Sequence, residues 1–124
     1  MSRLFLSLGA VNAFLCVGLG AFGAHGLKQK LSADMLAVYQ TGVQYHFYHA
    51  LGMLAIPLLL RAGLITEGSA TWAFRLLLIG ILFFSGSLYA LAISGKTILG
   101  AITPIGGAAF IAGWMAVAWG AMRK

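Results

Sequence analysis

The feature that most constrains this chain is a long apolar run near its start, from Leu4 to Ala24, which holds no charged residue. As a helix, a run of this length rises about 1.5 Å per residue and matches the roughly 30 Å hydrocarbon core of a bilayer. Arg3 before the run is also typical of a cleaved signal peptide, but the run is long for one and its small-residue site, Ala21-Phe22-Gly23, is weak. We therefore expect a retained membrane helix.

The composition extends this reading to the whole chain. Of 124 residues, 61% are hydrophobic and 8% are charged, whereas a soluble domain has about 45–50% and about 25%. So short a chain cannot enclose that much apolar surface. The net charge of +6 comes from basic residues standing singly between apolar runs, so we assign them to membrane flanks and expect no nucleic-acid partner. The single cysteine, Cys16, excludes an intrachain disulfide.

Four apolar stretches divide the chain, and they predict an all-α integral membrane bundle of four transmembrane helices in one domain, residues 1–124. The spans are expected at about residues 4–24, 41–60, 71–94 and 98–122. Ser32 is expected to cap a short helix ahead of the second span. Pro57 should bend that span or free a carbonyl in it.

The sequence allows two alternative starting points for the fourth span. Thr103 is a good N-cap, and Pro104 suits the first turn of a helix, so the helix could begin there. Alternatively, it begins near Lys96 and kinks at Pro104.

The flanking charges predict an orientation. Four spans place both chain ends on one side of the membrane, and that side carries five basic residues against three on the other. The first group is Arg3, Arg61, Arg75, Arg123 and Lys124, and the second is Lys28, Lys30 and Lys96. We therefore expect both termini in the cytoplasm.

Small residues recur every four positions on the last two spans, where they let another backbone approach closely. They are Gly86, Ala90 and Ser94 on the third span, and Ala112, Ala116 and Gly120 on the fourth. The sequence leaves open whether these stripes pack within one chain or between copies in a homo-oligomer.

The second span carries the polar side chains around which chemistry would be expected. At 100° per residue they fall in one broad arc, and the apolar side chains fall in the complementary arc. The polar arc holds Thr41, Gln44, Tyr45, His46, Tyr48 and His49, and the apolar arc holds Val43, Phe47, Ala50, Leu51, Leu54 and Leu58. Since polar groups are costly in hydrocarbon, we expect the polar arc to face the bundle interior.

This arc has several interpretations. It could be a hydrogen-bonded core that ties helices together, or it could bind an organic ligand, a lipid or a quinone headgroup. His46 and His49, with His25 as a third ligand, would also suit a transition metal, and two histidines could hold a haem. Asn12, in the middle of the first span, should face another helix because its amide needs partners. The candidate ligand-binding residues are Asn12, His25, Gln44, Tyr45, His46, Tyr48 and His49.

Four ordered motifs carry a family resemblance. They are Gly20-Ala21-Phe22-Gly23-Ala24-His25-Gly26-Leu27, Thr41-Gly42-Val43-Gln44-Tyr45-His46 with His49-Ala50-Leu51-Gly52, Phe84-Ser85-Gly86-Ser87-Leu88-Tyr89, and Thr103-Pro104-Ile105-Gly106-Gly107 through Gly113-Trp114. The chain resembles, over almost its whole length, the family called domain of unknown function 423 or UPF0382, which includes the transmembrane protein 256 group. The resemblance implies a small multi-pass protein, placed in the inner membrane in bacteria, and it carries over no enzyme activity.

Three functions follow as hypotheses. The first is an accessory membrane protein that binds a ligand, lipid or metal in a cavity lined by Gln44, His46 and His49. The alternative is a subunit of a small transporter or channel, acting as a homo-oligomer. An enzyme with a histidine base ranks last, because the only acids, Asp34 and Glu67, lie in predicted loops.

Overall fold

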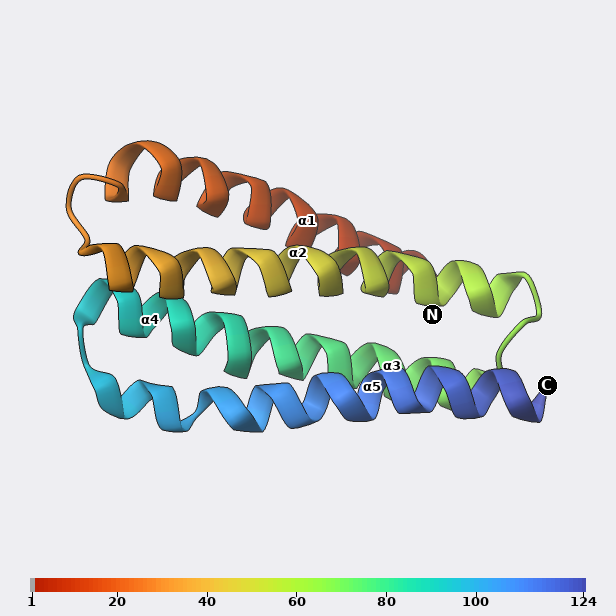
Figure 1. The fold of residues 1–124 in the computed structure, drawn as a ribbon. Coiled ribbons are helices and arrows are strands. Elements are labelled where there is room, and N and C mark those ends of the chain that lie inside the picture. The colour runs from red at the N-terminus through yellow and green to blue at the C-terminus, as the bar shows by residue number, and fades with distance from the viewer. Residues whose placement is uncertain (1) are drawn as a thin grey trace.

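The computed structural model describes residues 2–124 as an all-α bundle of long rods that run antiparallel to their neighbours along the chain (Figure 1). Its α-helices are α1 (Ser2–Phe22), α2 (Ala33–Arg61), α3 (Glu67–Gly80), α4 (Gly86–Ser94) and α5 (Thr103–Arg123). A π-helical turn, Ile81–Ser85, joins α3 and α4 into one rod, so the bundle has four rods. Both chain ends lie at the same end of the bundle.

Helix α2 is longer than the sequence analysis predicts. Ser32 caps its start as expected, since its hydroxyl accepts a hydrogen bond of 3.1 Å from the Met35 N–H. The helix does not stop before residue 41, however. It continues through Pro57 to Arg61, so the expected short helix and the second span are one element. At 29 residues it is about 43 Å long.

The last rod begins at the later of its two predicted starts. A short 3₁₀ turn, Thr97–Ala101, precedes it, and Pro104 lies in the first turn of α5. Thr103 does not act as the N-cap. Its hydroxyl instead bonds across to the Ser87 hydroxyl on α4 at 2.6 Å, which ties the start of α5 to the neighbouring rod.

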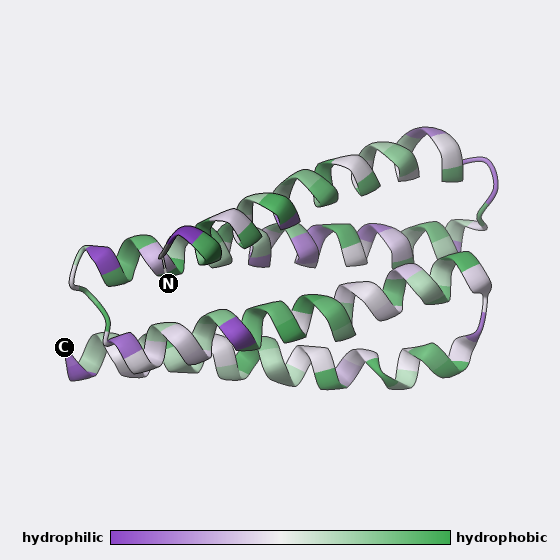
Figure 2. Ribbon diagram, turned by 180° about the vertical axis from the view of Figure 1, so that it is seen from behind, coloured by the Kyte–Doolittle hydropathy of each residue, from purple (hydrophilic) through white to green (hydrophobic). Residues whose placement is uncertain are grey.

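Three segments are long and apolar enough to cross a membrane, namely Arg3–Leu27, Glu67–Ser94 and Thr97–Arg123. Helix α2 is not among them, so composition does not support the fourth transmembrane helix that the sequence analysis predicts. The reason is the concentration of glutamine, tyrosine and histidine in α2, which Figure 2 shows as hydrophilic residues recurring along that rod.

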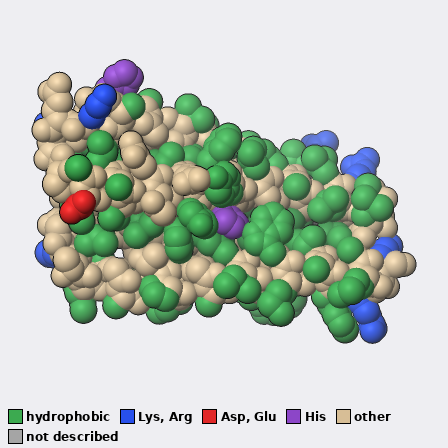
Figure 3. Space-filling model, viewed as in Figure 1, with side chains coloured by type: hydrophobic (Ala, Val, Ile, Leu, Met, Phe, Trp, Pro, Cys, Tyr) green, Lys and Arg blue, Asp and Glu red, His purple; other side chains and the backbone are tan. Residues whose placement is uncertain are grey.

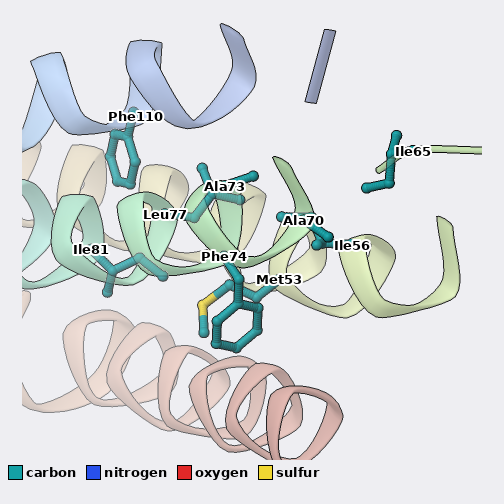
Figure 4. Close-up of a cluster of buried hydrophobic side chains, with 9 residues drawn as sticks. All are labelled: Met53, Ile56, Ile65, Ala70, Ala73, Phe74, Leu77, Ile81 and Phe110. Atoms are coloured by element: carbon teal, nitrogen blue, oxygen red, sulfur yellow. The ribbon is translucent and has the colours of Figure 1, made fainter. Parts of the chain in front are cut away.

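The main core lies where α2, α3 and α5 meet (Figure 4). Its members are Met53, Ile56, Ile65, Ala70, Ala73, Phe74, Leu77, Ile81 and Phe110. Helix α1 joins this core through Phe5, whose ring stacks on Phe74 with centroids 3.8 Å apart. The N-terminal half of α1 is thereby fixed to α3 as well as to α2.

Glycines seven residues apart on α5 bring it against the rod formed by α3 and α4. A Cβ added at Gly113 would meet the Leu77 side chain at 2.9 Å, and one at Gly120 would meet Ser69 at 2.4 Å. The stripes predicted at four-residue spacing are therefore only partly used in packing. Gly120 is buried, but Ala112 and Ala116 are half-buried, and Ala90 and Ser94 are exposed.

Candidate functional site

A chain of hydrogen bonds crosses the middle of the bundle through His46 of α2. The Nδ1 atom of His46 lies 2.9 Å from the Tyr89 hydroxyl of α4, and its Nε2 atom lies 3.1 Å from Asn12 Oδ1 of α1. The Asn12 amide in turn donates to the Leu8 carbonyl at 2.9 Å. His46 is only 4% exposed, so this chain is enclosed by the helices that it joins.

The partners of this chain determine where its protons lie. A backbone carbonyl only accepts, so the amide nitrogen of Asn12 must face Leu8 and its oxygen must face His46. His46 therefore carries its proton on Nε2, and its bare Nδ1 accepts from the Tyr89 hydroxyl. Both ring nitrogens are occupied by protein groups, which is the hydrogen-bonded core that the sequence left open as one interpretation.

His49 faces a different neighbour. Its Nδ1 donates to the Tyr45 carbonyl at 2.6 Å, and its ring stacks on Phe110 of α5 with centroids 3.5 Å apart and planes 8° apart. The Trp114 ring lies 5.9 Å away. Its Nε2 atom has no hydrogen-bond partner within residues 2–124. His49 thus packs as an aromatic ring between α2 and α5.

The outer part of the α1–α2 seam is held by two residues that sequence reasoning did not select. The Tyr39 hydroxyl donates to the Leu19 carbonyl, and the Cys16 thiol lies 3.2 Å from the Val43 carbonyl. Gly23 makes room for Tyr39, since an added Cβ would lie 2.4 Å from its ring. The glycines that precede His25 were the one sequence signal for this contact.

Gln44 and Tyr48 lie on the outside of the bundle. Both are exposed, and the Gln44 amide donates to the Tyr48 hydroxyl at 2.5 Å. They form part of an open groove of about 330 Å³ between α1 and α2, lined by Cys16, Val17, Gly20, Ala21, Val43, Gln44, Phe47 and Tyr48. A smaller hollow of about 180 Å³ shares Gly20, Val43 and Gln44 and reaches Ala24, Tyr39 and Gln40. We call the two hollows together the α1–α2 groove.

The predicted inward polar arc is therefore wrong for half of its members. Gln44, Tyr45 and Tyr48 are exposed, whereas Ala50, placed in the lipid-facing arc, is fully buried. The physical reason is that α2 is contacted by α1 on one side and by the other rods on the other side, and close approach needs small residues. Gly42 meets Tyr89 and Leu88, so the buried face is selected by shape more than by polarity.

The three histidines do not come together. His25 is exposed in the π-helical turn Gly23–Leu27 at the end of α1, far along the chain from the pair on α2. Figure 3 shows histidine side chains at two separate places on one face. Within the described residues, no group of three metal-ligating side chains is arranged to hold a metal ion, so the expected His25–His46–His49 metal site is not formed. The expected cavity is also corrected, because the groove includes Gln44 but neither His46 nor His49.

A known protein-family model matches most of the chain just described. The family model described as a protein of unknown function (DUF423) matches residues 19–107, a span that contains the whole of α2 and Tyr89. This chain belongs to the DUF423 family. The resemblance seen in the four motifs is thereby confirmed.

Full-length relatives of this DUF423 chain are named as membrane proteins. It is 51% identical over 98% of each chain to the UPF0382 membrane protein YwdK of Bacillus subtilis (strain 168). It is 42% identical to a UPF0382 membrane protein of Haemophilus influenzae, over 100% of this chain and 98% of the relative. No solved structure matches the chain. These names state a membrane location and no activity, so function is argued from the site.

Proposed function

We propose that this DUF423 chain is a four-span membrane protein that binds an uncharged amphipathic molecule, of the lipid or quinone class, in the α1–α2 groove. The observation that carries the proposal is the Gln44–Tyr48 pair, which is exposed on an otherwise apolar wall. Polar groups that face hydrocarbon are costly unless they meet a partner. A bound molecule with a polar head would supply that partner.

The arrangement of the rods supports a spanning position for α2, whatever its composition. Helix α2 lies antiparallel to α1 and connects the far end of α1 to the start of α3 (Figure 1). If its neighbours cross the bilayer, a helix about 43 Å long that lies alongside them crosses it too. His46 tolerates this position because both of its ring nitrogens bond to protein groups, and His49 is held by the bond from its Nδ1 to the Tyr45 carbonyl and by stacking on Phe110.

The chemistry of the groove indicates the class of ligand. No residue that lines it carries a formal charge, so a charged headgroup would find no counter-ion there. With the Gln44 amide donating to Tyr48, the Tyr48 hydroxyl hydrogen and the Gln44 carbonyl oxygen remain for a ligand. Val17 and Phe47 offer apolar surface beside them. The larger hollow is within the roughly 300–1,000 Å³ typical of small-molecule sites.

The hydrogen-bonded chain through His46 has a positioning role in this proposal. It joins α1, α2 and α4 at the level of Asn12 and so sets the separation of the groove's two walls. The proposed orientation follows the charge rule that the sequence analysis used. This rule favours both termini in the cytoplasm, on the side of the inner membrane that carries more basic residues.

A pair of glycine substitutions on α1 tests the groove. Gly20→Leu would fill it, because Gly20 lines both hollows and an added Cβ already meets Val43 at 3.4 Å. Gly18→Leu is the matched control, since an added Cβ at Gly18 meets nothing within 4 Å. Each protein is purified in mild detergent, and co-purifying small molecules are quantified by mass spectrometry. We expect the wild type and Gly18→Leu to retain a neutral amphipathic molecule that Gly20→Leu loses.

A second variant separates groove shape from groove chemistry. Gln44→Leu keeps the volume of the wall but removes the exposed amide, and we expect it to lower retention about tenfold, the effect of one hydrogen bond of about 1.4 kcal/mol. Equal retention by Gly20→Leu and Gly18→Leu, with Gln44→Leu also unchanged, would overturn the proposal.

A further inference from the structure

The opposite end of the α1–α2 seam holds a second cavity, and we propose that it binds the phosphate headgroup of an anionic phospholipid. The cavity has a volume of about 390 Å³ and is lined by Arg3, Leu6, Ser7, Pro57, Leu58 and Arg61. Two arginines, one from α1 and one from α2, therefore line the same space. The lining residues lie at positions 3–7 and 57–61, away from those of the α1–α2 groove.

Among the described residues, the side chains of the two arginines that line this cavity have no partner. Within residues 3–124, neither the Arg3 nor the Arg61 side chain makes an ion pair, a hydrogen bond or a ring contact. The other two arginines differ, since Arg75 lies 5.5 Å from the Trp72 ring and Arg123 lies 5.3 Å from the Trp119 ring. The cavity is thus lined by two cationic residues whose charge no other side chain of residues 3–124 neutralises.

The electrostatic surroundings favour an anion. Basic side chains gather at the end of the bundle where both termini lie, and Figure 3 shows no acidic side chain at that end of the face in view. The only acid placed at that end by the fold is Glu67, at the start of α3, and it makes no ion pair in the described chain. The basic side chains at that end outnumber this single acid, so the net field would attract a phosphate.

The shape and chemistry of the lining select a lipid. A guanidinium offers a planar fork of N–H donors that matches phosphate oxygens, and Ser7 adds a hydroxyl donor. Leu6, Pro57 and Leu58 give an apolar floor along which acyl chains can lie. Basic pockets between helices near a membrane surface are typical sites for anionic headgroups. A cavity at the end of the bundle, between two helices, has that position.

The test uses the full-length protein, delipidated in mild detergent and titrated with phosphatidylglycerol or phosphatidylcholine while bound lipid is counted by native mass spectrometry. The double variant Arg3→Gln with Arg61→Gln removes the two cavity charges. The matched control is Arg75→Gln with Arg123→Gln, which removes the same net charge outside the cavity. All four arginines are exposed, and circular dichroism checks that each variant remains helical.

We expect the wild type to bind phosphatidylglycerol more tightly than phosphatidylcholine. The cavity variant should lose about 10- to 30-fold in affinity for phosphatidylglycerol, because each basic residue near a lipid surface contributes about a factor of five. The control variant should lose less than about threefold, through net charge alone.

Three results would overturn the inference. The first is an equal loss of affinity in both double variants, and the second is no preference of the wild type for phosphatidylglycerol. The third is full competition by inorganic phosphate at the lipid's own concentration, which would identify a site for free phosphate. None of these results bears on the α1–α2 groove, whose tests use different residues and a neutral ligand.

Discussion

Gly106 of α5 lies against the backbone of Phe84, so closely that an added Cβ would stand 2.2 Å from the Phe84 nitrogen. Phe84 belongs to the π-helical turn between α3 and α4. The contact is therefore between two backbones, with no flexible side chain that could move aside. It packs the start of α5 directly against the turn that joins α3 and α4.

Gly106→Ala should destabilise the protein by about 1–3 kcal/mol, because overpacking against rigid backbone must shift a helix. The neighbouring Gly107 is the control, since its added Cβ would lie 3.8 Å from the Phe84 ring in ordinary contact. Gly107→Ala should leave stability unchanged or raise it by up to about 1 kcal/mol through helix propensity. Reversible unfolding in mixed micelles measures both. Equal stabilities for the two variants would contradict the close approach.

The bond between His46 and Asn12 should appear as coupling in a double-mutant cycle. His46→Ala, Asn12→Ala and the double variant should give a coupling energy of about 0.6–1.7 kcal/mol, the range for hydrogen bonds between membrane helices. As a control, the changes in unfolding free energy caused by Asn12→Ala and Ser94→Ala should be additive, because the Ser94 hydroxyl bonds the Ala90 carbonyl of its own helix. Unfolding free energies in the same micelles provide the measurement. A coupling energy of zero between His46 and Asn12 would contradict the hydrogen bond between them.

Two serines two residues apart should respond in opposite ways. Ser85 is fully buried, and its hydroxyl has no hydrogen-bond partner in the described structure. Ser85→Ala should therefore leave stability unchanged or raise it by about 1 kcal/mol, since a buried unpaired polar group is removed. Ser87→Ala should lower it by about 0.5–1.5 kcal/mol, because the Ser87 hydroxyl bonds Phe84 and Thr103. A larger loss for Ser85→Ala than for Ser87→Ala would show that Ser85 has a role in the fold that its contacts do not reveal.

Cys16 should report the integrity of the α1–α2 seam. It is the only cysteine in the chain and is 2% exposed, with its thiol against the Val43 carbonyl. A maleimide should label it slowly in the folded protein and quickly after denaturation in SDS, because burial blocks access to the thiol. Tyr39→Phe removes the bond to Leu19 and should speed labelling of the folded protein. Rapid labelling of the folded wild type would show that the seam is open.

The polar residues of α2 show where sequence reasoning succeeded and where it failed. Their presence on one helix, and the burial of His46 and His49, could be predicted from residue type and helical period. The exposed positions of Gln44 and Tyr48 could not be predicted. The helical period groups side chains on one arc, but it does not predict which part of that arc a neighbouring helix will cover. His46 and Tyr89 are 43 residues apart, and no local spacing connects them.

The sequence by itself determined that this protein is built of long apolar helices suited to a membrane, and it determined the family to which the chain belongs. These properties depend on composition and on local periodicity, and neither of these requires a tertiary contact. Tertiary structure alone decided which face of α2 is buried, where the α1–α2 groove and the arginine cavity open, and that the histidines stay apart. Helices in lipid associate where small residues let backbones meet, and those meeting points become visible only when all the rods are packed together.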